Sequence, residues 1–366
     1  MATRIGVDKW LFGITLTLVL WGLAMVFSAS AVMATERYGS PYTFLLKQSL
    51  WALLGLITMT GLMRVDYNRY NHAFVAYTLV GLTTLLLMVV FLMPGSHATH
   101  RWIRFGGFFS LQPSEVAKPV LVLFLAWFLQ NRMSQMKNWR RTLLPAALPG
   151  FVFVLLIVAE PDLGTAVVCF AVMGLMLFLA GIQWRYLIGA VLAGAVPLAA
   201  LLMLVPWRRA RIMAFLHPDA AVQGVGFQTN QSLIAVGTGG LNGLGYMEGV
   251  QKLFYLPEPH TDFIFATVAE EFGFLRTILM VLLFVLLGYR GLRAAALVRD
   301  PFGRFLAFGI TATILIQSFF NLSVVMGVLP NKGIPLPLIS SGGTSLFITL
   351  ASIGVLLNVT REIDGN

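Results

Sequence analysis

Charged residues and cysteine are scarce in this sequence. Only 11% of the 366 residues are charged, and Cys169 is the single cysteine. A soluble domain carries roughly a quarter charged residues, so the composition excludes an ordinary soluble globular protein. One cysteine excludes an intramolecular disulfide and a cysteine-based zinc site. Because Cys169 lies in an apolar run, we interpret it as a small buried hydrophobic side chain.

Several common catalytic motifs are also missing. The sequence has no Walker A loop and no His-Glu-x-x-His, which argues against a nucleotide-driven pump and a zinc protease. Residues 134–137 match the Ser-x-x-Lys pattern of penicillin-binding serines, but the companion motifs are lacking and we treat the match as chance. The glycine-rich stretch 237–245 follows no predicted strand, so it is not a dinucleotide site.

Apolar residues, in contrast, make up 58% of the chain, and the mean hydropathy is +0.83. Apolar runs of about 20 residues match the length of a membrane-spanning helix, and inside a bilayer such runs must be helical. We therefore predict an all-α integral membrane protein. The ten predicted spans cover residues 10–31, 44–63, 72–93, 114–130, 143–160, 163–181, 186–206, 262–289, 303–327 and 338–359. Around residues 160–162 the sequence allows two interpretations: two helices joined by a tight turn, or one broken segment.

The first span ends in Ser-Ala-Ser-Ala, which resembles a signal-peptide cleavage site. It is longer than a usual signal sequence, and nothing after it resembles a soluble secreted domain, so we predict a retained helix.

The basic residues indicate the orientation. The net charge is +10, and Lys and Arg gather in short loops, which favours membrane topology over nucleic-acid binding. With the N-terminus inside, fourteen Lys and Arg fall on the inner face and five in the short outer loops. Both termini are therefore predicted to be cytoplasmic. The whole chain, 1–366, forms one polytopic domain with a large extracytoplasmic loop at 207–261, between the seventh and eighth spans.

Asp262 is the first candidate for chemistry, because it stands where the large loop enters an apolar run. One interpretation is a helix cap, in which Thr261 or Asp262 accepts hydrogen bonds from the first helical turn. The other is a partly desolvated carboxylate with a raised pKa, suited to accepting a proton from a hydroxyl. The two roles are compatible.

Glu115 and Lys118 open the fourth span, three residues apart on one helix face. Ionisable groups in a span are costly and usually mark a functional region, although an ion pair that only fixes helix packing is the alternative. Glu270 and Glu271 in the eighth span raise the same question, with Arg276 as a candidate partner.

The connection at 329–345 contains three prolines and several glycines, which rule out a continuous helix. Non-helical backbone at membrane depth must lie against protein or a water-filled cavity, so we predict a re-entrant or cavity-lining segment. Its Lys332 would offer a positive charge to an anionic substrate. A plain surface loop is the alternative.

Three motifs in register resemble one known family. They are Gln112-Pro113-Ser114-Glu115-Val116-Ala117-Lys118, His260-Thr261-Asp262-Phe263-Ile264-Phe265 with Glu270-Glu271, and Gly333-Ile334-Pro335-Leu336-Pro337-Leu338-Ile339-Ser340-Ser341-Gly342-Gly343. Together with the ten-span layout they resemble the SEDS family (shape, elongation, division and sporulation) over essentially the whole chain. Residues 250–258 and 329–333 look more like the FtsW-like division branch than the RodA-like elongation branch.

The resemblance implies a peptidoglycan glycosyltransferase of the bacterial cytoplasmic membrane that polymerises lipid II on the outer face. It implies a class B penicillin-binding protein transpeptidase and other divisome proteins as partners, and no nucleic acid. Asp262 matches the family's essential aspartate, and Glu115 and Lys118 match its polar pair near the substrate cavity. Lys332, His260, Gln112 and Arg101 are the expected substrate-binding residues. No cofactor is certain, and a divalent cation (Mg²⁺ or Mn²⁺) stays open.

In the mechanism that we expect, Asp262 acts as general base on the attacking sugar 4-hydroxyl, and cationic groups offset charge on the departing pyrophosphate. Two alternatives remain open. A lipid transporter would also have ten spans, intramembrane charges and broken helices. A scaffold that recruits the transpeptidase would tolerate the loss of Asp262.

Overall fold

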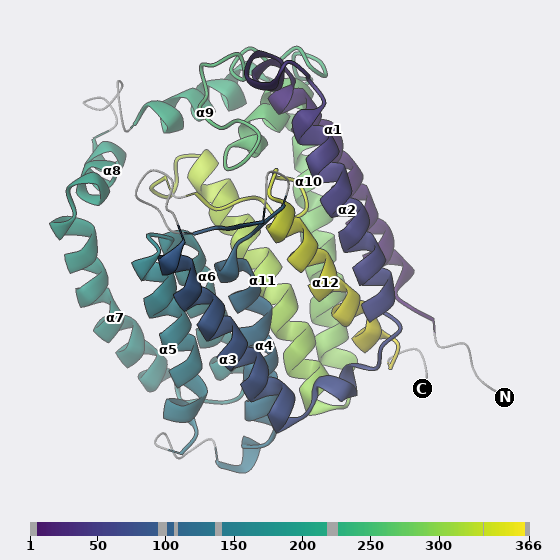
Figure 1. The fold of residues 1–366 in the computed structure, drawn as a ribbon, viewed down its shortest axis with the longest axis vertical. Helices are drawn as coiled ribbons and strands as arrows, with labels where there is room; N and C mark the ends of the chain where they lie inside the picture. Colours follow the sequence, from purple (N-terminus) through teal and green to yellow (C-terminus); the bar gives the residue numbers. More distant parts are fainter. Residues whose placement is uncertain are drawn as a thin grey trace.

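The structure is a computed structural model that describes residues 6–93, 101–105, 109–135, 141–217, 226–331 and 333–362. It is predominantly helical (Figure 1). In chain order the α-helices are α1 (Lys9–Tyr38), α2 (Thr43–Leu62), α3 (Ala73–Val89), α4 (Pro113–Gln130), α5 (Leu143–Ala159), α6 (Leu163–Leu179), α7 (Trp184–Leu204), α8 (Pro206–Leu216), α9 (Phe227–Thr238), α10 (Ile264–Leu297), α11 (Pro301–Val325) and α12 (Gly343–Thr360). Short 3₁₀ turns lie at η1 (Tyr67–Tyr70), η2 (Val90–Leu92) and η3 (Met133–Gln135).

The helices confirm a multi-pass membrane architecture. Within the described chain, six helices are long and apolar enough to cross a bilayer: α1, α2, α3 with η2, α10, α11 and α12. Shorter apolar helices are α5, α6 and the described start of α7. α4 spans 18 residues and carries Glu115 and Lys118 in its first turns, both buried. Burial of that pair shows that this end of α4 faces protein.

Four features differ from the sequence-based expectation. α1 continues past the Ser-Ala-Ser-Ala run to Tyr38, and Ser28 and Ser30 within that run are buried. α12 begins at Gly343, later than expected, because the backbone at Leu338 has a φ of 66° and is not helical. The predicted loop 207–261 contains α9 and most of α8.

The fourth difference is a small antiparallel hairpin, so the all-α prediction is wrong in this detail. β1 (Ile103–Phe105) pairs with β2 (Phe109–Leu111), and Ile103 lies opposite Leu111. The hairpin lies in the connection between α3 and α4. Outside the helices, pairing of two short strands satisfies backbone groups that no helix can serve.

The Glu160–Asp162 segment is a tight turn between two separate helices, which decides that open alternative. α5 ends at Ala159, and Asp162 caps α6 by accepting a hydrogen bond from the Thr165 backbone N–H at 3.2 Å. Aspartate at this position satisfies a backbone donor that has no partner within the helix.

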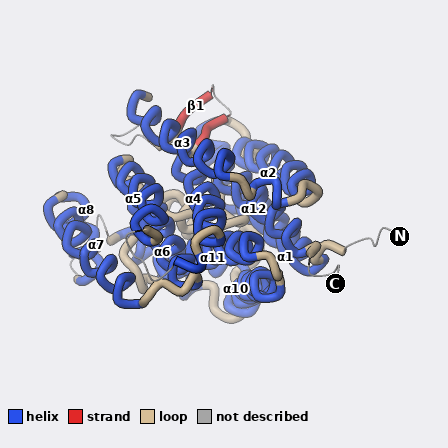
Figure 2. Tube along the Cα trace, turned by 90° about the horizontal axis from the view of Figure 1, so that it is seen from below, coloured by secondary structure: helices blue, strands red, loops and turns tan. Residues whose placement is uncertain are grey.

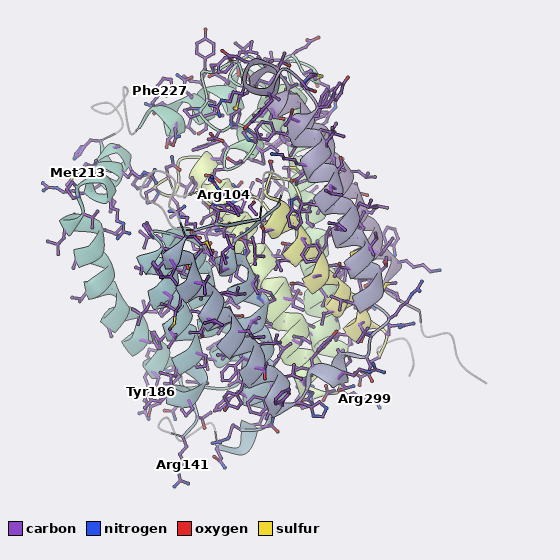
Figure 3. All side chains as sticks on the ribbon, viewed as in Figure 1. Arg104, Arg141, Tyr186, Met213, Phe227 and Arg299 are labelled. Atoms are coloured by element: carbon purple, nitrogen blue, oxygen red, sulfur yellow. The ribbon has the colours of Figure 1, made fainter. Side chains whose placement is uncertain are left out.

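Both ends of the described chain meet at one end of the bundle. The Asp8 carboxylate forms an ion pair with Arg290 at 2.6 Å, and the Asp8 backbone N–H donates to the Thr360 hydroxyl at 3.4 Å. Figure 3 shows Arg141, Tyr186 and Arg299 at this end and Met213 and Phe227 at the opposite one. We call the opposite end, which carries α8 and α9, the outer end (Figure 1).

α7 and α8 lie at the edge of the bundle, where α7 packs beside α6 (Figure 2). α11, in contrast, is packed against α4, α6, α9, α10 and α12. The buried polar side chains of α11 therefore have neighbours on several sides, and some of these neighbours belong to the outer end.

Candidate active site

The outer half of α10 is separated from the inner half by a break at Gly273, whose φ of 70° and ψ of −178° are not helical. Glycine adopts this backbone without a side-chain clash. The glycine-rich segment 239–245 fills the break. Phe274 and Leu275 donate backbone N–H bonds to the carbonyls of Gly240 and Leu241, at 2.9 and 3.2 Å.

The break also frees two carbonyls of the outer half, and the same segment satisfies them. Leu244 and Gly245 donate backbone N–H bonds to Glu270 and Glu271, each at 3.0 Å. A Cβ added at Gly243 would lie 2.1 Å from the Glu271 carbonyl oxygen, so only glycine fits there. The glycine-rich stretch is therefore a structural brace for α10.

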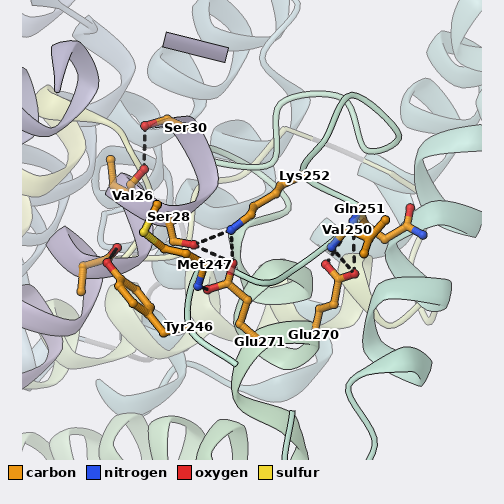
Figure 4. A network of polar contacts seen from close by, with 11 residues as sticks. Val26, Ser28, Ser30, Tyr246, Met247, Val250, Gln251, Lys252, Glu270 and Glu271 are labelled. Carbon is orange, nitrogen blue, oxygen red and sulfur yellow. Dashed lines mark hydrogen bonds and ion pairs between the residues drawn. The ribbon is translucent and has the colours of Figure 1, made fainter. Parts of the chain in front are cut away.

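Glu271 is saturated with partners (Figure 4). Its carboxylate accepts from Lys252 Nζ at 2.6 Å, from the Ser28 hydroxyl at 2.6 Å and from the Met247 backbone N–H at 3.1 Å. Its side chain is fully buried. The neutralising cation is thus Lys252, and the expected partner Arg276 instead donates to the Asn242 carbonyl.

Glu270 binds the neighbouring backbone in the same way (Figure 4). Its carboxylate accepts from the N–H groups of Val250 and Gln251, at 2.9 and 3.1 Å. Together Glu270 and Glu271 fix the chain at 247–252 against α1 and α10. Both are accounted for as structural groups.

Residues 260–262 are held by the connection between α11 and α12. The Ser340 hydroxyl donates to the Thr261 carbonyl at 2.6 Å, and the Ser341 backbone N–H donates to the His260 carbonyl at 2.9 Å. Asn321 of α11 donates through Nδ2 to the Asp262 carbonyl at 2.8 Å. The backbone of Asp262 is therefore fixed from two sides.

The Asp262 carboxylate faces a cavity of about 550 Å³ at the outer end, which we call the outer cavity. Its polar lining comprises Arg101, Asp162, Arg208, Arg211, Gln228, Glu258, Asp262 and Asn331. The prediction that Asp262 caps a helix is wrong, because the N-cap of α10 is Phe263 and no side-chain cap bond forms. Among the described residues, none donates a hydrogen bond to this carboxylate.

Burial raises the pKa of Asp262 to about 6. The negative charges of Glu258 and Asp162 raise this pKa further, and Arg101 and Arg211 oppose the increase. A carboxylate with a pKa near 6 is ionised at neutral pH and is still basic enough to accept a proton.

Three arginines from two segments line the outer cavity: Arg101 before β1, and Arg208 and Arg211 on α8. Arg101 donates through Nε to the Glu160 carbonyl at 3.1 Å and through Nη2 to the Pro161 carbonyl. Burial, followed by the charge of Arg101, lowers the pKa of both Arg208 and Arg211. Clustered guanidinium groups of this kind favour a bound phosphate or other anion.

Among the described residues, the other predicted site residues, Gln112, His260, Glu115 and Lys118, do not line the cavity. Gln112 donates through Nε2 to Asp162 at 3.1 Å, and Asp162 lines the cavity. His260 is buried and does not line the cavity; its ring lies against Phe44, with centroids 4.5 Å apart, and its Nε2 lies 3.8 Å from a carboxylate oxygen of Glu258, which does line it. Lys332 lies outside the described residues.

Glu115 and Lys118 form a buried 2.9 Å ion pair, and neither lines the outer cavity. Lys118 also donates to Gln317 Oε1 of α11 at 2.6 Å. Gln317 Nε2 in turn donates to the Pro335 carbonyl at 2.9 Å. The pair is therefore linked through Gln317 of α11 to the connection that follows this helix.

Sequence reasoning missed Asp162, Arg208 and Arg211 as cavity residues. In the sequence, Asp162 is recognisable only as part of the segment 160–162, and the two arginines only as residues of the long loop 207–261. A signal existed for the arginines, because basic side chains on the outer face run against the charge bias of the short loops.

The cavity combines three carboxylates, those of Asp162, Glu258 and Asp262, with three guanidinium groups. This set can remove a proton from a hydroxyl and stabilise negative charge on a leaving group. Within the described residues, no group of three or more His, Cys, Asp or Glu side chains lies close enough to hold a metal ion. A Mg²⁺ ion is commonly held by one or two carboxylates together with substrate phosphates, and Asp162 and Asp262 would be those carboxylates.

Fold and site together define a multi-pass helical membrane protein with a polar cavity, lined by three arginines and three acidic residues, at one end of its bundle. Comparison with known proteins identifies the family. Residues 8–364 match the family model of FtsW, RodA and SpoVE, described as cell cycle protein. The chain belongs to this family, and is therefore a multi-pass protein of the bacterial cytoplasmic membrane.

Two curated relatives cover nearly the whole chain. A Geobacter metallireducens protein named "Probable peptidoglycan glycosyltransferase FtsW" is 42% identical over 352 residues, 95% of this chain and 93% of the relative. The Bacillus subtilis stage V sporulation protein E is 41% identical over 358 residues, 97% of each chain. The name of the Geobacter relative fits the FtsW-like branch that residues 250–258 and 329–333 indicate.

Two solved structures share the fold. A chain of a peptidoglycan synthase complex that coordinates polymerization and crosslinking has a TM-score of 0.79 and 30% identity, covering 97% of this chain and 98% of that chain. The rod shape determining protein RodA of Thermus thermophilus has a TM-score of 0.72 and 28% identity, covering 98% of each.

Proposed function

We propose that this protein is a peptidoglycan glycosyltransferase that polymerises lipid II on the outer face of the cytoplasmic membrane during cell division. The observation that carries the proposal is the Asp262 carboxylate, which faces a cavity lined by three arginines. The names of the curated relatives and their cover of the whole chain support it.

The topology in this proposal has ten spans with both termini in the cytoplasm. The spans are α1 to α7 and α10 to α12, and residues 207–261 form the extracytoplasmic loop of a single domain, 1–366. The contacts that join Asp8, Arg290 and Thr360 support an even number of crossings. The excess of Lys and Arg in the loops at that end supports its cytoplasmic position.

In the reaction, Asp262 accepts the proton of the 4-hydroxyl on the acceptor sugar. The freed oxygen attacks C1 of the donor sugar, a C1–O bond forms, and the bond from C1 to the pyrophosphate oxygen breaks. The pyrophosphate leaves with the lipid and carries the negative charge. Arg101, Arg208 and Arg211 line the cavity where that charge develops, and groups aligned for such charge often supply the largest catalytic effect.

The remaining predicted residues act at a greater distance in this proposal. Gln112 holds Asp162 at the cavity wall, and Glu115 with Lys118 supports the outer end through Gln317. Lys332 stays a prediction as a further cation for the substrate. His260 faces Phe44, so its predicted contact with substrate would need a different side-chain position.

A class B penicillin-binding protein transpeptidase is the proposed partner, together with other divisome proteins. The support is the likeness to a chain of a peptidoglycan synthase complex that couples polymerization to crosslinking. No nucleic acid takes part.

The test uses purified protein and labelled lipid II in detergent, with and without the cognate transpeptidase. Polymer formed without any membrane barrier requires an enzyme and rules out a transporter. Asp262→Ala should abolish polymer formation. Asp66→Asn is the control, because Asp66 is an exposed carboxylate in the α2–α3 connection, and this substitution should leave polymer formation unchanged. Full polymerisation by a folded Asp262→Ala protein would reject the catalytic role of Asp262. A folded wild-type protein that forms no polymer in detergent would favour a scaffold or transporter.

A further inference from the structure

Two buried amides on α11 hold the outer end together. Asn321 and Gln317 lie one helical turn apart, and each is 2% exposed. Both hydrogens of Asn321 Nδ2 are used, because this atom donates to the Asp262 carbonyl at 2.8 Å and to the Ile334 carbonyl at 2.7 Å. A single side chain thus joins the segment before α10 to the connection before α12.

The orientation of the Asn321 amide follows from its neighbours. Both contacts are carbonyl oxygens, which accept and cannot donate, so only the NH₂ group can face them. The other amide atom, Oδ1, is buried without a hydrogen-bond partner in the described structure. An unsatisfied buried acceptor is costly. We therefore expect the two hydrogen bonds that Nδ2 donates to contribute more free energy than the unsatisfied Oδ1 costs.

Gln317 extends the same contact toward the membrane interior. Its Nε2 donates to the Pro335 carbonyl at 2.9 Å, and its Oε1 accepts from Lys118 Nζ at 2.6 Å. Because Lys118 is a donor only, it fixes which end of the Gln317 amide faces the connection. The buried Glu115–Lys118 pair is thereby linked to the backbone beside Asp262.

The space around Asp262 leaves little room for movement. A Cβ at Gly333 would lie 2.8 Å from Asp262 Oδ2, so the connection approaches the carboxylate closely. If the connection moved by about 1 Å, the position of the carboxylate in the cavity would change. A displacement of that size can cost about a hundredfold in rate.

We infer that Asn321 is a positioning residue: by donating to the Asp262 and Ile334 carbonyls, it sets the position of the Asp262 carboxylate. We call these two hydrogen bonds the clamp. Gln317 connects the buried Glu115–Lys118 pair to the same connection that the clamp holds. This inference rests on the proposed role of Asp262 as general base. It gives the intramembrane ion pair a function, although the pair does not line the cavity.

The chain offers a matched control in Asn358, near the end of α12 at the opposite end of the bundle. Asn358 is 6% exposed, donates to the Met63 carbonyl at 2.8 Å and accepts from the Tyr67 backbone N–H at 2.9 Å. Asn358→Ala therefore removes two comparable bonds to backbone without touching the outer cavity.

The experiment compares wild type, Asn321→Ala, Asn358→Ala and Asp262→Ala as full-length proteins polymerising labelled lipid II in detergent, with rates expressed per folded molecule. We expect Asn321→Ala to lower kcat about 10- to 100-fold with little change in KM. Asn358→Ala should keep the wild-type kcat, although both substitutions lower the thermal stability.

The pH profile separates positioning from a general loss of folded protein. The charges that act on Asp262 are Glu258, Asp162, Arg101 and Arg211. All of them stay in Asn321→Ala. Release of the clamp lets water reach Asp262, so the acidic limb of the rate should move to lower pH. Loss of folded protein alone would reduce the amplitude and leave the limb in place.

Equal kcat and equal pH limbs in Asn321→Ala and wild type would overturn the inference, provided that Asp262→Ala is inactive. Activity in Asp262→Ala would instead overturn the proposed role of Asp262 as general base, and no polymer from folded wild type would overturn the proposed function. If Asn321→Ala does not fold, Asn321→Ser, which keeps one donor, replaces it. A wild-type kcat in that variant would count against the clamp.

Discussion

Asp262 and Glu271 are two carboxylates at the two ends of the outer half of α10, and their surroundings are opposite. Glu271 is fully buried and accepts from a lysine, a serine and a backbone N–H. Asp262 accepts from no described residue and faces a cavity lined by arginines. A carboxylate whose partners are all supplied by the protein maintains structure. One left without donors beside an anion-binding cavity is available to a substrate.

The comparison also applies to stability. A buried ion pair with added hydrogen bonds is compatible with a stable fold, and losing one partner is costly. A desolvated carboxylate with a raised pKa costs stability when it is ionised. The two residues should therefore respond to the same chemical change, carboxylate to amide, in opposite directions.

The largest expected effect is on activity at Asp262. Asp262→Asn removes the proton acceptor but keeps the shape, so polymerisation of labelled lipid II should fall about 100- to 10,000-fold. Rates are measured with purified protein in detergent, and folded protein is quantified by size-exclusion chromatography. A rate within a few fold of wild type would contradict the assignment.

Asp262→Asn should at the same time stabilise the protein at neutral pH. The pKa of Asp262 is raised to about 6 in the folded state. Ionisation of Asp262 therefore lowers the free energy of unfolding. This free energy is highest at low pH, where the carboxyl is protonated, and it decreases as the pH rises through the folded-state pKa of about 6. The neutral amide removes that cost, so the gain at pH 7.5 is about 1–3 kcal/mol. Thermal unfolding at pH 7.5 and pH 4.5 tests the sign, and the gain should be clearly smaller at the lower pH.

The second effect is on stability at Glu271. Glu271→Gln leaves Lys252 buried without its counter-charge, which should cost about 3–5 kcal/mol. Polymerisation per folded molecule should stay near wild type. Replacing both partners with Lys252→Met and Glu271→Leu should recover part of the stability. An unchanged melting temperature in Glu271→Gln would show that the network contributes little.

The third effect concerns the arginines. Arg211→Ala removes a guanidinium group from the outer cavity, and a hydrogen bond to a charged group is worth about 1.5–3 kcal/mol. We expect kcat/KM for lipid II to fall roughly 10- to 100-fold. The exposed Arg209 on the same helix does not line the cavity, so Arg209→Ala is the matched control. Equal losses in the two variants would point to a general surface effect.

The smallest effect is the pH dependence of the wild-type rate. The base must be unprotonated, so activity should fall as pH drops through the pKa of about 6 at Asp262. Between pH 7 and pH 5 the rate should decrease about tenfold. Initial rates in buffers of constant ionic strength give the midpoint. A flat profile over this range would argue against Asp262 as the titrating base.

Much of the fold could be predicted, because apolar runs and loop charge determine membrane helices directly. Helices α2 and α5 begin and end within about a residue of the expected spans. The partner of Glu271 could not be predicted, because Lys252 reaches it through a glycine-braced loop and not through helix spacing.

The site itself was only partly predictable. Asp262 and Arg101 were expected and line the outer cavity. Asp162, Arg208 and Arg211 join them only because a tight turn and an extra helix, α8, place them there. No periodic pattern in the sequence indicates the helix α8 or the role of Asn321.

The most direct test of the central claim, that Asp262 is the proton acceptor, is lipid II polymerisation per folded molecule for Asp262→Asn and Glu271→Gln side by side. Both substitutions convert one carboxylate of α10 or its entry to an amide. The account predicts a stable but inactive Asp262→Asn and an unstable but active Glu271→Gln. Full activity in Asp262→Asn, with loss of activity in folded Glu271→Gln, would contradict it.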